Sequence, residues 1–461
     1  MQVFREAGPS NNRSTGTRWK ALCLALLILA GGEFVFRGPV RAIRTATQFN
    51  DFLSPYIQAN AWRRGLDPYS AETLLKLWPA GAAHFQFLTK EVADGSLIAK
   101  RGIPTAYPIP SLVLIAPFTL LPWGAAYALW LTINLALFAI MLWVLGALAG
   151  FSYREPSAAL LAAGTLALAP FHTGIVTGNV ALVAVEFGVI AVWTAHRDHD
   201  VMTAILLAAS AGLKPQIGLC FLMYYLARRR WRVFGMAVAL LAGVAAVGLL
   251  RLEAGHTPWV ANYLNDNRVL LETGVLANFT PVNPTRFGLI NLQVVLYSLA
   301  GSVQLANYLA MSVGAIFLVV WAIVISRSNS SPESELLDLS TIAVVSLLPV
   351  YHRFYDAAVL VLPLCWVCLS FRKARPAAVV ALLLMLPFAI PGGTILETLQ
   401  ADGRIPAALA SHWWWERIVM PHQIWALLFL SILLLFQMLS RERVAHASGS
   451  ADPGLNRVLL P

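Results

Sequence analysis

Long apolar runs separated by short polar segments dominate this chain and limit what it can fold into. The clearest runs cover residues 124–148, 233–250, 301–326 and 422–439. A helix needs about 20 apolar residues to cross a bilayer, where its backbone polar groups must be satisfied within the helix. Only 12% of the 461 residues are charged, against about 25% in a typical soluble protein. The chain is therefore predicted to be an all-α integral membrane protein.

The runs predict one polytopic membrane domain, residues 20–440, with about twelve transmembrane helices. The run 111–121 is short and is broken by Pro117 and Pro122, so we expect it to be re-entrant or half-buried. The other predicted spans are 20–36, 157–171, 179–195, 201–213, 216–227, 337–350, 357–370 and 377–391.

Basic clusters beside the runs predict the orientation, because cytoplasmic loops are rich in lysine and arginine. The sequence RRRWR at residues 228–232 is the strongest such cluster. With this cluster inside, residues 1–19 and a tail at 441–461 that we expect to be disordered are both cytoplasmic. The outer loops are then residues 38–108, 251–300 and 392–419. The net charge of +10 is explained by these basic loops and does not indicate nucleic-acid binding.

The first outer loop, residues 38–108, begins with polar and aromatic residues. Ser54 as N-cap and Pro55 at the first helical position predict a short helix, which Gly65 is placed to end. Asp51 then lies in the loop just ahead of this helix. A carboxylate beside a membrane surface suggests a functional site, although a solvated loop explains it as well.

The rest of this loop carries three further signals. Asp67-Pro68 predicts a turn. Residues 78–91 are rich in aromatics and predict an interfacial amphipathic helix. The segment Tyr107-Pro108-Ile109-Pro110 cannot form a regular helix, because neither proline has an amide donor.

Motifs of soluble nucleotide-binding and hydrolytic enzymes are missing from the sequence. It contains no Walker A motif, no G-x-G-x-x-G after a strand, no H-E-x-x-H and no serine nucleophile elbow. The four cysteines lie inside apolar runs and form no disulfide or metal framework. If the chain is an enzyme, its activated substrate must come from elsewhere, and the bilayer is the natural source.

Polar residues within or between apolar runs are costly and usually functional. Asn179 and Lys214 interrupt two pairs of runs, and a lone lysine there must find an anion or a carboxylate. His352 and Arg353 belong to a polar block, residues 351–356, between two apolar spans. These cations suit the phosphate group of a lipid. The alternative is that each caps a helix or snorkels to the interface.

Five short motifs together resemble glycosyltransferase family 87, whose members are polyprenol-phosphate-mannose-dependent mannosyltransferases of bacterial membranes with the GT-C fold. These motifs are Asp51-Phe52, Gly65-x-Asp67-Pro68-Tyr69, Tyr107-Pro108 with Pro110, Gly178-Asn179 and Gly212-Leu213-Lys214-Pro215. The sequence departs from the family pattern at Asn179, where glutamine is usual, and at Pro55, where aromatics are expected.

The resemblance implies an inverting transfer of a sugar, mannose by default, from a polyprenyl-phosphate donor to an envelope glycan or lipid. It implies a GT-C-like helical bundle in the bacterial inner membrane, with the site facing the periplasm. Asp51 would be the catalytic base. The implied substrate-binding residues are Asp67, Tyr69, Tyr107, Asn179, Lys214, His352 and Arg353. No cofactor is expected, and a requirement for a divalent metal stays open.

Two other functions are compatible with such a chain. One is a non-enzymatic lipid or glycan flippase or transporter, which would more often show an internal repeat with paired broken helices. The other is an envelope-polysaccharide assembly subunit that binds glycan without turnover. The sequence shows no such repeat, and the long outer loop beginning with Asp51 favours an enzyme.

Overall fold

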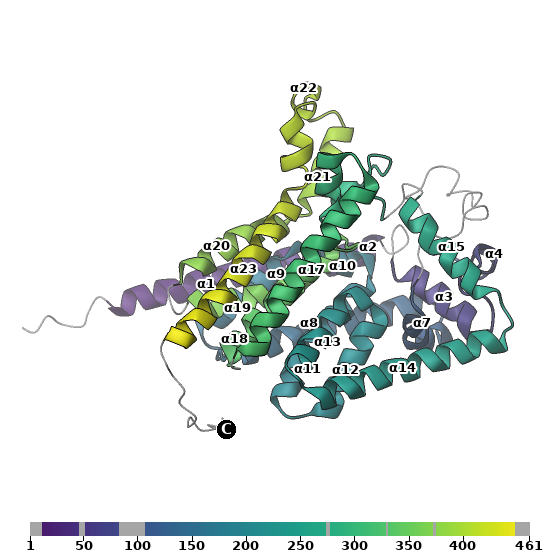
Figure 1. The fold of residues 1–461 in the computed structure, drawn as a ribbon, viewed down its shortest axis with the longest axis horizontal. Helices are drawn as coiled ribbons and strands as arrows, with labels where there is room; N and C mark the ends of the chain where they lie inside the picture. Colours follow the sequence, from purple (N-terminus) through teal and green to yellow (C-terminus); the bar gives the residue numbers. More distant parts are fainter. Residues whose placement is uncertain are drawn as a thin grey trace, which may run out of the picture.

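The fold is all-helical throughout the described residues, which are 12–45, 51–82, 107–272, 277–328, 331–371 and 375–447 of a computed structural model (Figure 1). The one pairing of extended backbone in these ranges is an isolated antiparallel bridge between Leu289 and Arg353. The prediction of an all-α protein is confirmed for this part of the chain.

Six helical segments in the described ranges are long and apolar enough to cross a membrane, and the number rises to eight if two bent pairs each form one span. The protein is therefore a multi-pass membrane protein. The expected total of about twelve spans stays a prediction. The six segments are Arg18–Thr45, Trp123–Leu148, Trp231–Ala254, Val303–Arg327, Phe354–Phe371 and His422–Arg441, and the bent pairs are Pro156–Ala167 with Ala169–Thr177 and Pro376–Ala389 with Gly392–Ala401.

The N-terminal half contains one long first helix, several short ones and then a series of apolar helices. Its elements are α1 (Asn12–Val35), η1 (Phe36–Val40), α2 (Arg41–Thr45), α3 (Leu53–Arg63), α4 (Ala71–Lys76), α7 (Ile109–Ile115), η2 (Ala116–Leu120), α8 (Trp123–Leu148), α9 (Pro156–Ala167), α10 (Ala169–Thr177), α11 (Val180–His196), α12 (Asp200–Leu213) and α13 (Pro215–Ala227).

The C-terminal half alternates long helices with short turns. Its elements are α14 (Trp231–Ala254), α15 (Trp259–Glu272), η3 (Arg286–Gly288), α16 (Gln293–Ala300), α17 (Val303–Arg327), α18 (Pro332–Ser346), η4 (Phe354–Leu360), α19 (Val361–Phe371), α20 (Pro376–Met385), η5 (Leu386–Ala389), α21 (Gly392–Ala401), α22 (Ala407–Ala410), η6 (Trp415–Val419) and α23 (His422–Ala447).

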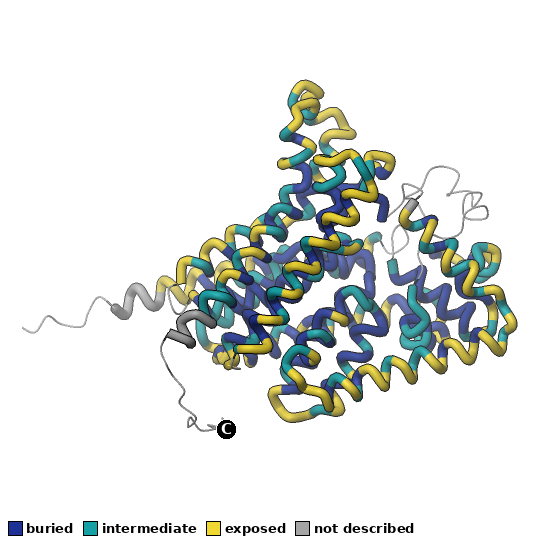
Figure 2. The backbone as a smooth tube through the Cα atoms, viewed as in Figure 1, coloured by how far each residue is buried: buried dark blue, intermediate teal, exposed yellow. Residues whose placement is uncertain are grey.

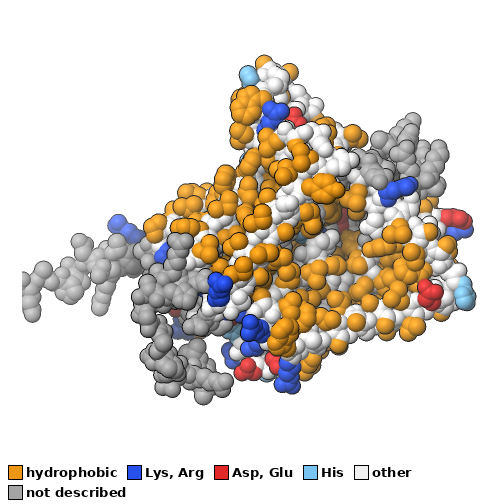
Figure 3. Space-filling view, in the orientation of Figure 1, with side chains coloured by type: hydrophobic (Ala, Val, Ile, Leu, Met, Phe, Trp, Pro, Cys, Tyr) orange, Lys and Arg blue, Asp and Glu red, His pale blue; other side chains and the backbone are white. Residues whose placement is uncertain are grey.

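The helices form two groups, which meet where α13 packs against α18, α9 against α19 and α10 against η4. In the first group α11 contacts α8 and α12, while α14 covers α12 and α7; in the second, α18 contacts α17, α19 and α23. Figure 2 shows α11 buried, whereas α14 and α17 each keep an exposed face. Figure 3 shows that these exposed faces are largely hydrophobic. Exposed apolar faces of this extent are expected where helices contact lipid.

The loops predicted to be cytoplasmic lie together at one end of the molecule. Arg228 Nη1 donates to the carbonyl of Ser328 at 2.9 Å, and His196 Nε2 lies 2.7 Å from a carboxylate oxygen of Glu335. Arg441 joins the same end through a carboxylate of α18 at 3.2 Å. The prediction that these loops share one side of the protein agrees with this arrangement.

Helix α3 begins two residues earlier than its local capping signal suggests. Phe52, not Ser54, is the N-cap, and no side chain caps the helix. The ring of Phe52 is buried and stacks on Trp130 with centroids 4.4 Å apart. This packing fixes the backbone at Phe52 and overrides the weaker serine signal. Gly65, with φ +74°, ends the helix as predicted.

Other sequence predictions also meet the described elements. The tail expected to be disordered from residue 441 is helical up to Ala447, where α23 ends, and its residues 448–461 lie outside the described residues. The segments 251–300 and 392–419, which we predicted to be outer loops, contain helices of their own, including α15 and α21. Of the expected interfacial helix at 78–91, residues 83–91 lie outside the described residues.

The crossing of α12 and α13 should not tolerate a methyl group at Gly218. A Cβ there would lie 2.2 Å from the backbone nitrogen of Ala211. We expect Gly218→Ala to lower the free energy of unfolding by about 1–3 kcal/mol, measured by thermal unfolding in detergent. The matched control is Gly235→Ala in α14, where a Cβ meets nothing within 4 Å. Equal unfolding temperatures for the two variants would contradict this packing.

Candidate functional site

Asp51 is held in place by the turn between α10 and α11. Its backbone N–H donates to the carbonyl of Thr177 at 2.5 Å, and its Oδ2 accepts from Asn179 Nδ2 at 2.8 Å. Gly178 ends α10 in the left-handed conformation, φ +65°, and Asn179 caps α11 by accepting from the backbone N–H of Ala181. The Gly-Asn pair thus ends one helix, starts the next and orients the Asp51 carboxylate.

Lys214 forms a buried ion pair at the corner between α12 and α13. Its Nζ lies 2.5 Å from Asp356 Oδ1, and the two side chains are 12% and 0% exposed. The other oxygen of Asp356 accepts from the backbone N–H of Arg353 at 3.0 Å and lies 3.1 Å from His352 Nδ1. The Lys214 ammonium also lies 4.8 Å from the centre of the Tyr355 ring. The predicted need of Lys214 for a carboxylate is met by Asp356.

Arg353 is the cation of this group whose charge can act on a bound anion. It is half-buried, and no ion pair holds its guanidinium within the described part of the chain. Its backbone is fixed by the bridge to Leu289 and by the N–H of Ile290, which donates to the carbonyl of His352 at 3.1 Å. The guanidinium is close enough to Asp51 to lower the pKa of that carboxyl.

The Asp51 carboxyl is partly exposed but sits in a protein environment that favours its neutral form. Burial raises its pKa above the ordinary value for aspartate. Hydrogen bonds from Asn179 and Tyr355 and the charges of Arg353 and Lys214 act in the opposite direction and lower the pKa. A carboxylate with a raised pKa is a stronger base than an ordinary one.

Tyr107 borders the same group of charges from the start of α7. Burial raises the pKa of its phenol, and the nearby carboxylate of Asp51 raises it further. Its backbone carbonyl accepts the hydroxyl of Tyr69 at 2.8 Å. The phenol therefore stays protonated and can donate a hydrogen bond into the site.

Asp67 and Tyr69 belong to a separate cluster against α15. Asp67 Oδ1 accepts from the backbone N–H of Tyr69 at 2.9 Å, which makes the predicted turn, and its Oδ2 accepts from Asn262 at 2.7 Å. Burial and the neighbouring Asp67 raise the pKa of Asp266 to about 8. These contacts tie the residues after α3 to α15, and the Tyr69 hydroxyl connects this cluster to Tyr107 beside the Asp51 group.

The structure thus brings five of the eight predicted residues together. Of the other three, His352 lies behind this group, and Asp67 and Tyr69 lie in the cluster against α15. The five are Asp51, Tyr107, Asn179, Lys214 and Arg353. His352 is 0% exposed and lies behind Asp356. Sequence reasoning missed Asp356, although the polar block at 351–356 and the unpaired Lys214 were both signals that pointed to it.

Among the described residues no group of three or more histidine, cysteine, aspartate or glutamate side chains could hold a metal ion. The expectation of a reaction without cofactor or metal stays a prediction.

The fold and the site define a multi-pass membrane protein that presents a basic carboxylate beside a free guanidinium. The family model of glycosyltransferase family 87 matches residues 105–350, which is more than half of the chain. The chain belongs to this family and is a glycosyltransferase. Neither the comparison with curated proteins nor that with solved structures finds a match. The matched segment includes Tyr107, Asn179 and Lys214, while Asp51 and Arg353 lie outside it.

Loss of the lysine from the buried ion pair should destabilise the protein strongly. Lys214→Met leaves the Asp356 carboxylate buried without its ammonium, at a cost of about 3–5 kcal/mol in the free energy of unfolding. Adding Asp356→Asn should recover much of this loss, because the buried charge is then removed. Thermal unfolding in detergent measures both.

The control for this test is the exposed pair of Lys76 and Glu72, whose side chains are 72% and 79% exposed. Lys76→Met should leave the unfolding temperature unchanged, since exposed pairs contribute little. If Lys214→Met behaves like Lys76→Met, the ion pair does not hold this corner together.

Proposed function

We propose that this glycosyltransferase transfers mannose from a polyprenyl-phosphate donor to a glycan or lipid acceptor of the bacterial envelope. The observation that carries the proposal is the Asp51 carboxylate, oriented by Asn179 and flanked by the free guanidinium of Arg353. Such a transfer needs a base that accepts the proton of the acceptor and a cation that stabilises the leaving phosphate. The Asp51 carboxylate and the Arg353 guanidinium can serve as these two groups.

In the proposed step, Asp51 removes the proton of an acceptor hydroxyl as its oxygen attacks the anomeric carbon of the donor. The new carbon–oxygen bond forms while the bond between the anomeric carbon and the phosphate oxygen breaks. The electron pair leaves with the polyprenyl phosphate, whose charge is stabilised by Arg353. A single displacement of this kind inverts the anomeric centre.

Lys214 has a different part in this proposal from Arg353. Its ammonium is neutralised by the ion pair with Asp356, so Lys214 acts mainly by holding the 351–356 segment in place. Its positive charge also helps Arg353 to lower the pKa of Asp51. His352 supports Asp356 from the buried side. No metal is assigned to the step, because the leaving phosphate has protein cations beside it.

The bilayer is the proposed source of the donor. The sequence has no nucleotide-binding motif, and the site is surrounded by helices with exposed apolar faces. A polyprenyl chain can lie along such faces while its phosphate reaches the polar group at the helix ends.

The periplasmic side is proposed from the direction of three helices. Asn179 and Lys214 stand at the ends of α11, α12 and α13 that are opposite to His196, Asp200 and Arg228. The latter end carries the basic loops, which the charge rule assigns to the cytoplasm. The Asp51 site then faces the periplasm.

Removal of the Asp51 carboxylate should abolish transfer but not folding. In membranes expressing the protein, Asp51→Asn should lower transfer from radiolabelled polyprenyl-phosphate mannose by about 10²–10⁴-fold, the usual contribution of a general base. Asp402→Asn, which changes an exposed outer-loop carboxylate, is the control and should keep full activity. Equal label from wild type and Asp51→Asn at equal expression would rule out Asp51 as the base.

The pH profile should report the charge of Arg353 through Asp51. Activity needs the Asp51 carboxylate, so it falls as the pH drops through a pKa above the ordinary value for aspartate. Arg353 lowers that pKa, so Arg353→Gln should move the acid limb of kcat/KM to higher pH as well as reduce the rate. Arg404→Gln, an exposed outer-loop change, should leave the limb in place. An acid limb of kcat/KM that is unchanged or moves to lower pH in Arg353→Gln would contradict the effect of Arg353 on the pKa of Asp51.

A further inference from the structure

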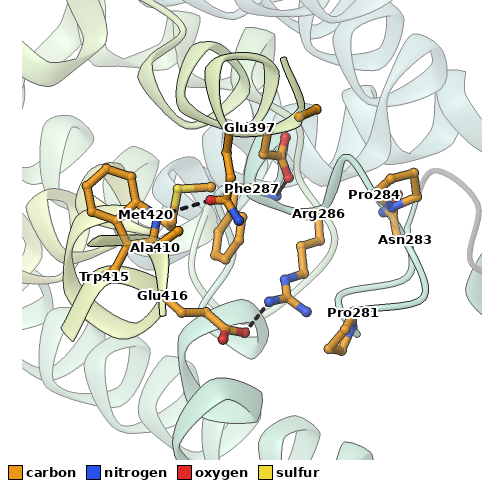
Figure 4. Close-up of a pocket in the computed structure, with 12 residues that line it drawn as sticks. Pro281, Asn283, Pro284, Arg286, Phe287, Glu397, Ala410, Trp415, Glu416 and Met420 are labelled. Carbon is orange, nitrogen blue, oxygen red and sulfur yellow. Dashed lines mark hydrogen bonds and ion pairs between the residues drawn. The ribbon is translucent and has the colours of Figure 1, made fainter. Parts of the chain in front are cut away.

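A cavity of about 370 Å³ lies between the 281–287 segment, α21 and η6 (Figure 4). Its volume falls within the usual range for small-molecule pockets, about 300–1,000 Å³. All three elements belong to the second and third predicted outer loops. The glycosyl transfer proposed above makes no use of this cavity.

The cavity combines aromatic rings with unsatisfied polar groups. Trp415 and Phe287 supply the rings, and Trp415 Nε1 donates to the side-chain oxygen of Gln400 at 3.0 Å. Arg286 is 8% exposed and forms an ion pair with Glu416, as Figure 4 shows. Its Nη1 nevertheless has no hydrogen-bond partner among the described residues, and neither has Oε2 of Glu397. Buried donors and acceptors left open in this way are costly unless a ligand or water satisfies them.

The charges of the cavity decide which kind of ligand it fits. Two carboxylates, Glu397 and Glu416, face a single guanidinium, that of Arg286. The guanidinium of Arg286 is already paired with Glu416, so it offers a phosphate group little uncompensated positive charge. A sugar instead offers uncharged hydroxyls that both donate and accept, and C–H faces that pack on aromatic rings. The lining therefore suits a neutral sugar unit and not the donor's phosphate.

A short segment connects this cavity to the Asp51 site. The backbone N–H of Phe287 donates to Glu397 Oε1 at 2.8 Å, and two residues further on Leu289 pairs with Arg353. Arg353 lowers the pKa of Asp51 on its other side. A Cβ built at Gly288 would lie 3.8 Å from Arg353 Nη2, so the segment that lines the cavity also contacts the guanidinium of the Asp51 site.

We propose that this cavity is an acceptor subsite, which binds a sugar unit of the growing glycan beyond the unit that reacts. The proposal rests on the glycosyl transfer proposed above and narrows its acceptor to a glycan, free or lipid-linked, that has at least one sugar unit besides the unit that reacts. Glu397 and Trp415 are then positioning residues for the acceptor.

A glycan array separates this proposal from the proposed reaction, because it measures binding without turnover. Detergent-purified, fluorescently labelled protein is applied to arrayed neutral and anionic bacterial-type oligosaccharides of increasing length. We expect wild type to bind neutral oligosaccharides, and Glu397→Gln and Trp415→Ala to lose at least tenfold in affinity. Glu397→Gln keeps the shape of the side chain, so it reports binding even if Trp415→Ala unfolds.

The matched control is Trp413→Ala, which removes a tryptophan that is 64% exposed and does not line the cavity. It should bind as wild type does. Failure of wild type to bind any neutral oligosaccharide, or unchanged binding by Glu397→Gln, would overturn the subsite.

Transfer from labelled polyprenyl-phosphate mannose, measured on the same proteins, distinguishes the two proposals. Glu397→Gln should lower transfer at least tenfold while leaving the affinity for the donor unchanged. A loss of donor affinity would assign the cavity to the donor and overturn the acceptor subsite. If wild type transfers nothing but binds glycans through the cavity, the proposed reaction fails and the glycan site is supported. If transfer is intact and Glu397→Gln changes nothing, only the subsite fails.

Discussion

The buried ion pair between Lys214 and Asp356 is the contact on which the rest of the site depends. It joins the corner of α12 and α13 to the segment that enters η4, two parts of the chain separated by 142 residues. Removing two charges from water is costly, and close geometry with extra hydrogen bonds is needed to offset this. Both are present, because the second oxygen of Asp356 is held by His352 and by the backbone of Arg353. The pair thereby fixes where the free guanidinium of Arg353 stands.

The breaks between short helices place polar side chains around Asp51. Gly178 and Asn179 interrupt the chain between α10 and α11, and Lys214-Pro215 does so between α12 and α13. Such interruptions are tolerated at membrane depth only where they are buried in protein or line a polar cavity. Here they bring helix ends and polar side chains to Asp51, so the departures from regular helix are what build the site.

Much of this could be predicted from the sequence, because apolar runs and basic loops follow directly from the physics of the bilayer. The all-α fold and the shared end of the basic loops are of this kind, whereas the role of Asp51 and the choice of Tyr107 came from the resemblance to the family. Pairing across long sequence separations was not accessible: Lys214 signalled that it needed a carboxylate, but only the folded chain identifies Asp356. Local signals also failed where packing was stronger, as at Ser54, where the stacking of Phe52 on Trp130 sets the helix start. The cavity around Arg286 and Glu397 is built from three separate loop segments, and no single motif marks it.

In the proposed reaction Asp51 activates the hydroxyl that attacks the anomeric carbon, and Arg353 stabilises the phosphate that leaves it. A cryo-electron microscopy structure of the protein with polyprenyl phosphate, the released product of the donor, tests these two roles most directly. We expect phosphate oxygens about 3 Å from the guanidinium of Arg353, on the side that faces Asp51. Phosphate bound instead in the cavity beside Arg286, or at the end that carries the basic loops, would contradict it.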